Sequence, residues 1–499
     1  MQRERRAGIL MPVSALPSPY GIGTLGKAAF GFVDWLQSAG MRLWQVLPLG
    51  PTGYGDSPYQ SCSADALNYY FIDLDLLKEE GLLEKGEYAD ADWGGDARRV
   101  DYAKLFSRRA GVLRLAFARF DTSAEDWQRF LREGTYADFA LFMALKVRFG
   151  YRPWTEWPEP FRDGNGEAVR AWAAENGEEL HFWQFTQYLF LKQWRALRDY
   201  ARERGVAIMG DMPIYVAGDS AEMWKRRREL FLLDAEGNPA AVAGVPPDAF
   251  SETGQLWGNP VYDWEKMKRD GYGWWRRRIL GALKLFDAVR IDHFRGFDRF
   301  YAIPAGAEDA RGGEWKKGPG AALFEGLEGA NIVAEDLGII DGGVRALLQK
   351  TGYPGMKVME FGFNGDPHSE HKPQNFSSNC VAYTGTHDNS PLVGYIEGLD
   401  EGGRNVFDAD LKGMCKVLGV RLRGSDAKSE CRAATEALFA SAAGTVVLPV
   451  HDVLGLGEEA RINRPSVLSP LNWSYRYRAE DFGAVRANRL RRLAEKYGR

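Results

Sequence analysis

Eight short runs rich in apolar and β-branched residues recur along the chain, each bounded by Gly, Pro or polar residues. Helix-period segments precede several of these runs, as at 27–39, 190–204, 273–284, 342–350 and 429–442. Strand and helix alternating eight times predict an α/β protein built on a closed (β/α)8 barrel, with an open doubly wound sheet as the structural alternative. The predicted strands are 8–12, 43–48, 206–212, 286–291, 331–334, 355–361, 379–383 and 445–450.

Two gaps between the predicted strands are much longer than one crossover needs. They span about 50–205 and 213–285, and we interpret both as insertions into a single catalytic barrel covering 1–499. The first gap is mostly helical by periodicity, with amphipathic stretches at 107–117, 136–149 and 167–176. The second is rich in Gly and Pro over 234–260, which predicts a long irregular loop, and such loops on compact domains are usually functional.

Composition excludes several classes of partner. The 499 residues carry a formal net charge of −4 and a pI near 6.0, which argues against nucleic acid or an anionic membrane as the main partner. No apolar run is long enough to span a bilayer, and the start lacks the apolar stretch of a secretory signal. The four cysteines are scattered without C-x-x-C spacing, so we expect reduced thiols in a cytoplasmic protein.

Acidic residues stand where the predicted strands end. Asp292, Glu335 and Asp388 follow strands four, five and seven, and Asp211 lies at the end of strand three. In barrels the carboxyl ends of the strands meet on one face, where the chemistry takes place. Paired carboxylates on such a face are what glycoside bond cleavage requires. The 16 Trp, 21 Tyr and 27 Phe would fill a large core and leave some aromatic faces for stacking sugars.

The residue types suggest distinct roles. Arg290 shares a strand face with Asp292 and is expected to lower its pKa, keeping it ionised as a nucleophile. Glu335 suits the proton donor if burial or a neighbouring carboxylate raises its pKa. Asp388 would stabilise positive charge, while His293 and His387 would be neutral donors to hydroxyl groups. Each pattern also has a plain structural interpretation: an ion pair for Arg290–Asp292, a solvated strand end for Glu335 and a hydrogen bond for His387–Asp388.

Cofactor motifs are weak. The segment 21–26 fits G-x-G-x-x-G, but it follows Ser-Pro-Tyr instead of a strand, so dinucleotide binding is disfavoured. The His and Asp pairs lack the helical spacing of a metal site, and we predict neither a metal nor a cofactor.

Longer motifs carry a specific resemblance. The chain resembles the 4-α-glucanotransferases of the amylomaltase, or disproportionating enzyme, family within the α-amylase superfamily. The match at 244–260, Gly-Val-Pro-Pro-Asp-Ala-Phe-Ser-Glu-Thr-Gly-Gln-Leu-Trp-Gly-Asn-Pro, is far more diagnostic than the short acidic motifs. The other matching segments are 17–26, 44–53, 55–60, 210–216, 290–296, 334–338, 385–389 and 461–466.

The resemblance implies a retaining double displacement on α-1,4-glucans, with α-glucan donor and acceptor and no metal. By motif position Asp292 would be the nucleophile, Glu335 the acid/base and Asp388 the stabiliser in the first donor subsite. It also implies a barrel without the C-terminal β-sandwich of many amylases. The remaining residues that the resemblance places in substrate binding are Arg290, His293, His387, Asp211, Ser57, Tyr59, Asn463 and, in a lid over the cleft, Asp248, Gln255 and Trp257.

Transfer would prevail over hydrolysis if the 244–260 lid, with Trp257, excluded water and favoured the acceptor. The nearest alternative is an α-1,4-glucan hydrolase with the same three acids. A catalytically silent glucan-binding protein and an NAD-dependent barrel oxidoreductase are more distant ones. The sequence predicts neither the preferred chain lengths, nor cyclic products, nor the oligomeric state, nor the physiological pathway.

Overall fold

The computed structural model describes residues 5–247 and 251–499. Eight parallel strands close into a barrel in the order β1-β12-β11-β10-β9-β6-β3-β2. All eight predicted strands are confirmed, and the open-sheet alternative is wrong because β1 pairs with both β2 and β12. Their bounds are β1 Arg6–Leu10, β2 Leu43–Gln45, β3 Ala207–Met212, β6 Ala288–Ile291, β9 Ile332–Ala334, β10 Gly355–Val358, β11 Cys380–Tyr383 and β12 Thr445–Pro449.

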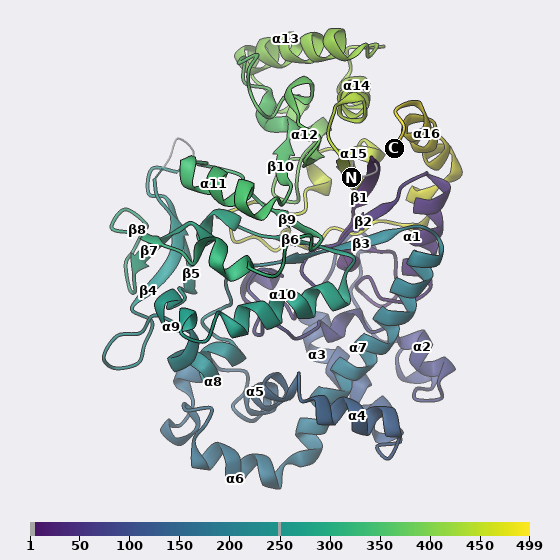
Figure 1. Cartoon of the computed structure of the whole chain (residues 1–499). Coiled ribbons are helices and arrows are strands. Elements are labelled where there is room, and N and C mark those ends of the chain that lie inside the picture. The colour runs from purple at the N-terminus through teal and green to yellow at the C-terminus, as the bar shows by residue number, and fades with distance from the viewer. Residues whose placement is uncertain (1–4, 248–250) are drawn as a thin grey trace.

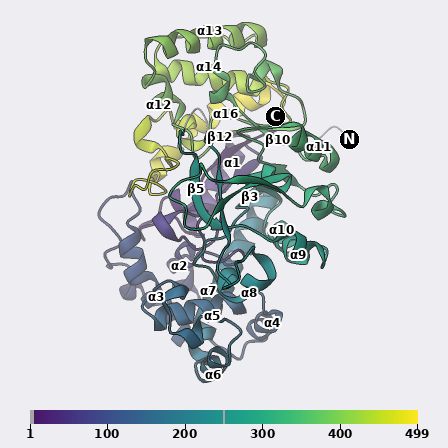
Figure 2. The same cartoon turned by 90° about the vertical axis from the view of Figure 1, so that its left-hand side faces the viewer.

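Helices surround the barrel and fill the two long connections (Figure 1). Helices α2 to α7 all lie between β2 and β3, and they form the lower part of the molecule in Figure 2. The bounds up to β3 are α1 Lys27–Ser38, α2 Leu74–Glu79, α3 Tyr102–Ala118, α4 Glu125–Glu133, α5 Ala137–Arg148, α6 Glu167–Glu175 and α7 Gly177–Glu203. Those that follow are α8 Ala221–Leu230, α9 Trp264–Lys268, α10 Gly273–Leu285, α11 Gly342–Thr351, α12 Leu392–Glu397, α13 Glu401–Leu418, α14 Ala427–Ala440, α15 Val450–Leu454 and α16 Ala484–Lys496.

Helix ends follow local sequence signals. The Asp341 carboxylate accepts the N–H groups of Gly343 and Val344 at the start of α11. Gly352 ends the same helix with φ +68°, a left-handed conformation that costs glycine little. No helix formed by the described residues is long and apolar enough to cross a membrane.

The prediction of an irregular loop over 234–260 is wrong for the two segments that form strands. Strands β4 Ala241–Val245 and β5 Gln255–Pro260 form an antiparallel pair there. With β7 Arg299–Pro304 and β8 Glu314–Lys317 they make a second sheet, in the order β5-β4-β7-β8. Glycines interrupt both β4 and β5, which hides the alternation that would identify them from sequence.

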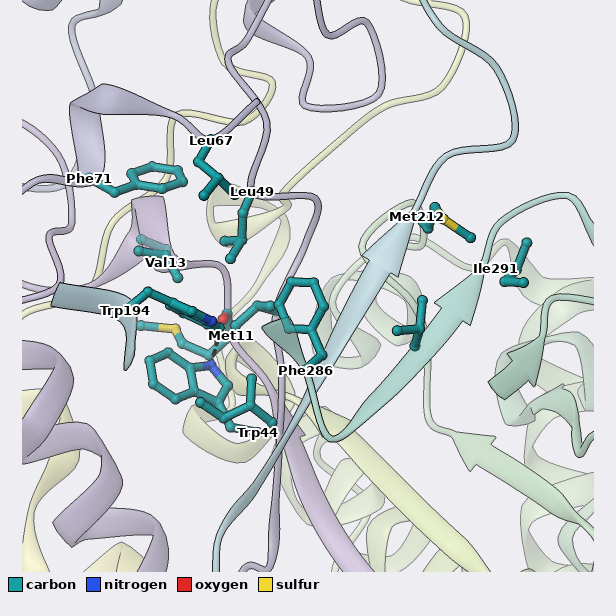
Figure 3. Packing of buried hydrophobic residues seen from close by; sticks show 14 of the residues in the cluster. Met11, Val13, Trp44, Leu49, Leu67, Phe71, Trp194, Met212, Phe286 and Ile291 are labelled. Atoms are coloured by element: carbon teal, nitrogen blue, oxygen red, sulfur yellow. Dashed lines mark hydrogen bonds between the residues drawn. The ribbon is translucent and has the colours of Figure 1, made fainter. Parts of the chain in front are cut away.

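The hydrophobic core joins the barrel to the helices of the first connection. Trp194 of α7 packs edge-on against Phe286 with ring centroids 5.6 Å apart (Figure 3). Trp44 of β2 lies fully buried nearby, and its indole N–H donates to the Met11 carbonyl at 2.8 Å. Removing a buried indole from this seam would cost about 3–5 kcal/mol. This packing anchors the helical connection between β2 and β3 to the barrel.

Candidate active site

The barrel register brings a cation between two carboxylates. Strands β3 and β6 pair with Asp211 opposite Arg290. Arg290 Nη1 donates to both oxygens of Asp211, at 2.7 and 2.8 Å, and its Nη2 donates to Asp292 Oδ1 at 2.9 Å. All three bonds are charge-assisted, and the planar guanidinium fixes their directions. The Arg290 guanidinium therefore fixes the orientation of the Asp292 carboxylate.

Asp292 is less acidic than the sequence led us to expect. Its side chain is 27% exposed, directly after the end of β6. Burial raises the pKa of Asp292, and Arg290 opposes that rise. The expectation of a lowered pKa is wrong because lost hydration outweighs the cation, whose attraction is shared with Asp211.

Glu335 receives two backbone hydrogen bonds. It follows β9, and its Oε2 accepts the His293 N–H at 2.6 Å while Oε1 accepts the Leu337 N–H at 2.8 Å. Burial raises its pKa to about 7; Arg290 lowers it, and the charge of Asp292 raises it further. No side-chain cation bonds to Glu335 within the described residues, so of the two carboxyls it is the one that keeps a proton near neutral pH. The predicted raised pKa is confirmed.

His293 adopts an uncommon backbone conformation, with φ +47°. This left-handed turn directs its N–H to Glu335 while its ring contacts Trp257 edge-on, with centroids 4.9 Å apart. Burial lowers the pKa of the imidazole to about 3, and Arg295 adds to that effect. The expectation that His293 is neutral is confirmed. Its Nε2 is buried and has no hydrogen-bond partner among the described residues.

Asp388 and His387 form a charged pair. Their Oδ2 and Nε2 atoms lie 3.3 Å apart, and Asn463 Nδ2 donates to Asp388 Oδ1 at 2.6 Å. Although burial raises the pKa of Asp388, His387 and Asn463 bring it down to about 2. Burial lowers the pKa of His387, but Asp388 raises it above its usual value overall. The expectation that His387 is neutral is thus wrong in direction, because Asp388 stabilises the imidazolium.

Tyr59 links this pair to the arginine. Its ring stacks on His387 at 5.1 Å, with an interplanar angle of 16°, and its hydroxyl donates to Asp211 Oδ2 at 2.7 Å. Trp473 packs against both rings, at 5.7 Å from Tyr59 and 5.8 Å from His387. Sequence reasoning missed Trp473. The signal was a tryptophan next to Asn472 and Ser474, well past the last predicted strand.

The predicted lid residues lie partly in a strand. Trp257 belongs to β5, and its indole N–H donates to Gln255 Oε1 at 3.1 Å. Gln60 Nε2 donates to the Trp257 carbonyl at 3.4 Å and to Asn259 Oδ1 at 3.1 Å, tying β5 to the loop after β2. Asp248 lies outside the described residues. The Ser57 hydroxyl accepts the Tyr59 N–H at 3.2 Å.

A buried chain of polar groups supports the loop that carries Asp388. Asn389 Oδ1 accepts the N–H and the hydroxyl of Thr386, both at 2.9 Å, while its Nδ2 donates to Glu360 Oε1 at 2.8 Å. Arg461 Nη2 donates to the Asp388 carbonyl at 2.8 Å. Sequence reasoning also missed Glu360 and Asn389 as parts of the site, because no local pattern connects positions on different strands.

One face of the barrel therefore carries three carboxylates in different states. Asp292 is oriented by Arg290, Glu335 holds a proton near neutral pH, and Asp388 is strongly acidic. This combination supplies an oriented carboxylate, a proton donor and a fixed negative charge, which are the groups that acetal cleavage requires.

The family model for 4-alpha-glucanotransferases matches residues 11–481, almost the whole chain. The chain belongs to the 4-alpha-glucanotransferase family. The resemblance found in the sequence motifs is thereby confirmed. Family membership also favours transfer over the hydrolase alternative.

Individual members of the family are similar over their full length. The 4-alpha-glucanotransferase of Clostridium butyricum is 41% identical, over 98% of this chain and 100% of the relative. That of Thermus thermophilus is 43% identical, over 99% of each. Among solved structures, an amylomaltase from Streptococcus agalactiae in complex with acarbose aligns with a TM-score of 0.92 and 39% identity, over 99% of this chain and 100% of that one. This enzyme of the glucanotransferase family thus has the barrel of an amylomaltase.

Proposed function

We propose that the enzyme transfers α-1,4-glucan segments between maltooligosaccharide or longer α-glucan chains by a retaining double displacement. The observation that carries the mechanism is the asymmetry between Asp292, bonded to Arg290, and Glu335, bonded only to backbone N–H groups. Two carboxyls whose surroundings differ in this way are suited to separate nucleophile and acid/base roles.

In the first step Asp292 would attack the anomeric carbon with its Oδ2, because Oδ1 is bonded to Arg290. Glu335 would give its proton to the glycosidic oxygen of the leaving chain. The product is a glycosyl ester on Asp292 with inverted configuration. Asp388, with a pKa near 2, would stay ionised and stabilise the oxocarbenium-like transition state.

In the second step Glu335, now ionised, would take the proton from the 4-hydroxyl of an acceptor chain. That oxygen attacks the anomeric carbon from the side that the leaving group vacated, and Asp292 departs as a carboxylate. The second inversion restores the α configuration. Water would give hydrolysis by the same route, so the outcome depends on acceptor binding and on excluding water.

We propose the substrate contacts from the same geometry. His293 and Asn463 present polar atoms beside Glu335 and Asp388, and Tyr59 and His387 form a stacked platform. Arg290 and Asp211 would act beneath the first donor subsite, and Gln255 and Trp257 above it. Ser57 and Asp248 remain candidates by resemblance alone.

A maltotriose time course tests the proposed function. Longer maltooligosaccharides and glucose should accumulate while the concentration of reducing ends stays nearly constant. A steady rise in reducing ends with shorter products alone would contradict transfer. Trapping of a glycosyl adduct on Asp292 in an acid/base variant, detected by mass spectrometry, would identify the nucleophile.

Two further proposals concern the domain organisation of the chain and its location in the cell. We propose that the whole chain acts as one catalytic unit, supported by the continuous core between the barrel and α7. We also propose a cytoplasmic location, supported by four cysteines that are all free thiols.

A further inference from the structure

A basic groove lies between α14 and α16, away from the catalytic carboxylates. The two helices contact each other on the outside of the barrel (Figure 1). Two adjoining cavities of about 730 and 400 Å3 share Arg432, Asp452, Val453, Val485 and Arg489 in their walls. We call their combined lining the basic groove. Each of the two cavities is by itself within the size range of small-molecule sites, about 300–1,000 Å3.

Cationic side chains from two segments of the chain line the basic groove. Arg421, Arg423, Lys428 and Arg432 come from α14 and the loop before it. Arg486, Arg489, Arg492 and Lys496 come from α16. This concentration of cations contrasts with the net charge of −4 for the whole chain, so it is a local feature and not a consequence of a basic protein.

The carboxylates of the lining are already engaged. Glu436 accepts from Lys496 Nζ at 2.6 Å and from the Tyr497 hydroxyl at 3.0 Å. Asp452 turns inward, where it accepts the Leu392 N–H at 2.7 Å and the Thr384 hydroxyl. At the N-cap of α14, Asp426 accepts the N–H and the hydroxyl of Ser429.

The arginines of the basic groove bond to neutral oxygens instead. Arg432 donates to Ser429 Oγ at 2.6 Å, Arg486 to the Asp481 carbonyl at 3.1 Å and Arg489 to the Val453 carbonyl at 2.8 Å. Within the described residues, no carboxylate forms an ion pair with any of the six arginines. Burial lowers the pKa of Arg489, and the nearby charges of Arg432 and Arg486 lower it further. Their mutual repulsion would be relieved by a bound anion.

The dipoles of helices α14 and α16 add to the positive electrostatic potential of the basic groove. Helices α14 and α16 run side by side in the same direction, since Lys496 pairs with Glu436 at one end and Val485 lies near Lys428 at the other. Their amino-terminal turns, which carry partial positive charge, therefore meet at the end where Lys428, Arg432, Arg486 and Arg489 gather.

We propose that the basic groove binds the phosphate groups of a phosphate-bearing ligand. Guanidinium forks match phosphate oxygens in a bidentate manner, and several of them spread along a groove suit more than one phosphate. Such groups occur on free organic phosphates, including nucleoside diphosphates, and on α-glucan chains that bear phosphate esters. Binding in the basic groove does not depend on the proposed transfer reaction.

Isothermal titration calorimetry on the full chain, at low and at physiological ionic strength, tests the proposal. The probes are tripolyphosphate, ADP, and a phosphorylated maltooligosaccharide beside its unphosphorylated form. We expect saturable one-to-one binding of at least one phosphate probe at physiological ionic strength. A response to the phosphorylated sugar alone would assign the ligand to glucan phosphate esters, and a response to tripolyphosphate or ADP to free organic phosphates.

Matched variants locate the site. The Arg432→Gln/Arg489→Gln pair should weaken binding at least about tenfold, since two guanidinium donors to phosphate are lost. The Arg129→Gln/Arg132→Gln pair removes the same charge from the exposed face of α4 and should change nothing. Arg492→Gln decides the matter if the double variant is unfolded in circular dichroism, because residues 5–247 and 251–499 give the Arg492 guanidinium no hydrogen-bond or ion-pair partner. Absence of saturable binding by every probe, or equal weakening in the α4 control, would overturn the proposal.

Discussion

Asn389 Nδ2 donates a hydrogen bond to Oε1 of the buried Glu360, 2.8 Å away, and so connects the end of β10 to the loop that carries Asp388. Replacing Glu360 with Ala would leave the Asn389 amide unpaired, and we expect kcat on maltotriose to fall about tenfold, since a lost buried hydrogen bond costs about 1–3 kcal/mol. Glu360→Gln keeps an acceptor oxygen and should retain most of the activity. Equal losses in both variants would show that the carboxyl itself, and not its support of Asn389, matters.

Glu360 should also make stability depend on pH. Burial raises its pKa from 4.5 to about 8, so the folded chain keeps a proton that the unfolded chain has lost between these pH values. Stability from this group is therefore complete below about pH 4.5 and declines as pH rises towards 8. Glu360→Gln should stay within about 1 kcal/mol of the parent protein in urea unfolding at pH 5 and exceed it by about 4–5 kcal/mol at pH 9. An unchanged difference between the two pH values would contradict this assignment.

Arg290→Lys should strongly impair turnover. A lysine retains the charge but cannot hold Asp211 and Asp292 together with separate nitrogens of one rigid plane. We expect kcat to decrease about 100-fold, as for other displacements of a catalytic group. Arg198→Lys is the matched control, because Arg198 also bonds to an aspartate, Asp287 at 3.1 Å, but outside the site. Similar losses in both variants would point to general destabilisation.

The alkaline limb of the rate profile should report Glu335. A general acid works only while protonated, so kcat/KM for maltotriose should fall as pH rises through about 7. The limb belongs to the coupled Asp292–Glu335 pair, and ionised Asp292 sets the acidic side. Because its pKa is near 3, His293 should contribute no inflection near neutrality. The rate of Glu335→Gln would be followed with an activated donor whose leaving group needs no protonation. If the alkaline limb persists in this variant, another group is responsible for the limb.

Trp257→Ala should shift the balance from transfer towards hydrolysis. The indole contacts His293 edge-on at the margin of the candidate site, where it would limit access of water to the glycosyl ester. We expect the hydrolysed fraction of maltotriose to rise about tenfold, equivalent to a change of about 1.4 kcal/mol. Leu256→Ala, on the adjacent exposed position of β5, should leave the fraction unchanged. An unaltered ratio in Trp257→Ala would remove the role of this residue in excluding water.

The strands of the barrel could be predicted from sequence because each is buried on both faces. Runs such as Val289–Arg290–Ile291 and Val446–Val447–Leu448 have few polar interruptions, and Asp292 and Glu335 directly follow such runs. The second sheet could not be predicted, since β4 and β5 contain glycine and β4 depends on β7 for its second pairing. These strands gain their conformation from partners distant in sequence.

The electrostatics of the site were predictable only in part. Placing Arg290 beside Asp292 followed from the two-residue period of a strand, but the sharing of its charge with Asp211 depends on the register between β3 and β6. The raised pKa of His387 likewise depends on how closely Asp388 approaches it in space. Sequence patterns identify which groups are present, whereas their charge states depend on burial and on distances of a few ångströms.

The closure of the barrel has a consequence for biosynthesis. Ala7 of β1 pairs with Val446 of β12, so one edge of the first strand stays unpaired until the chain has been synthesised through β12. Until then the growing sheet exposes unpaired backbone groups on that edge, which other nascent chains could engage. The barrel therefore cannot close before β12 has been synthesised. Synthesis that stops between α13 and β12 should yield aggregation-prone fragments instead of a smaller working enzyme.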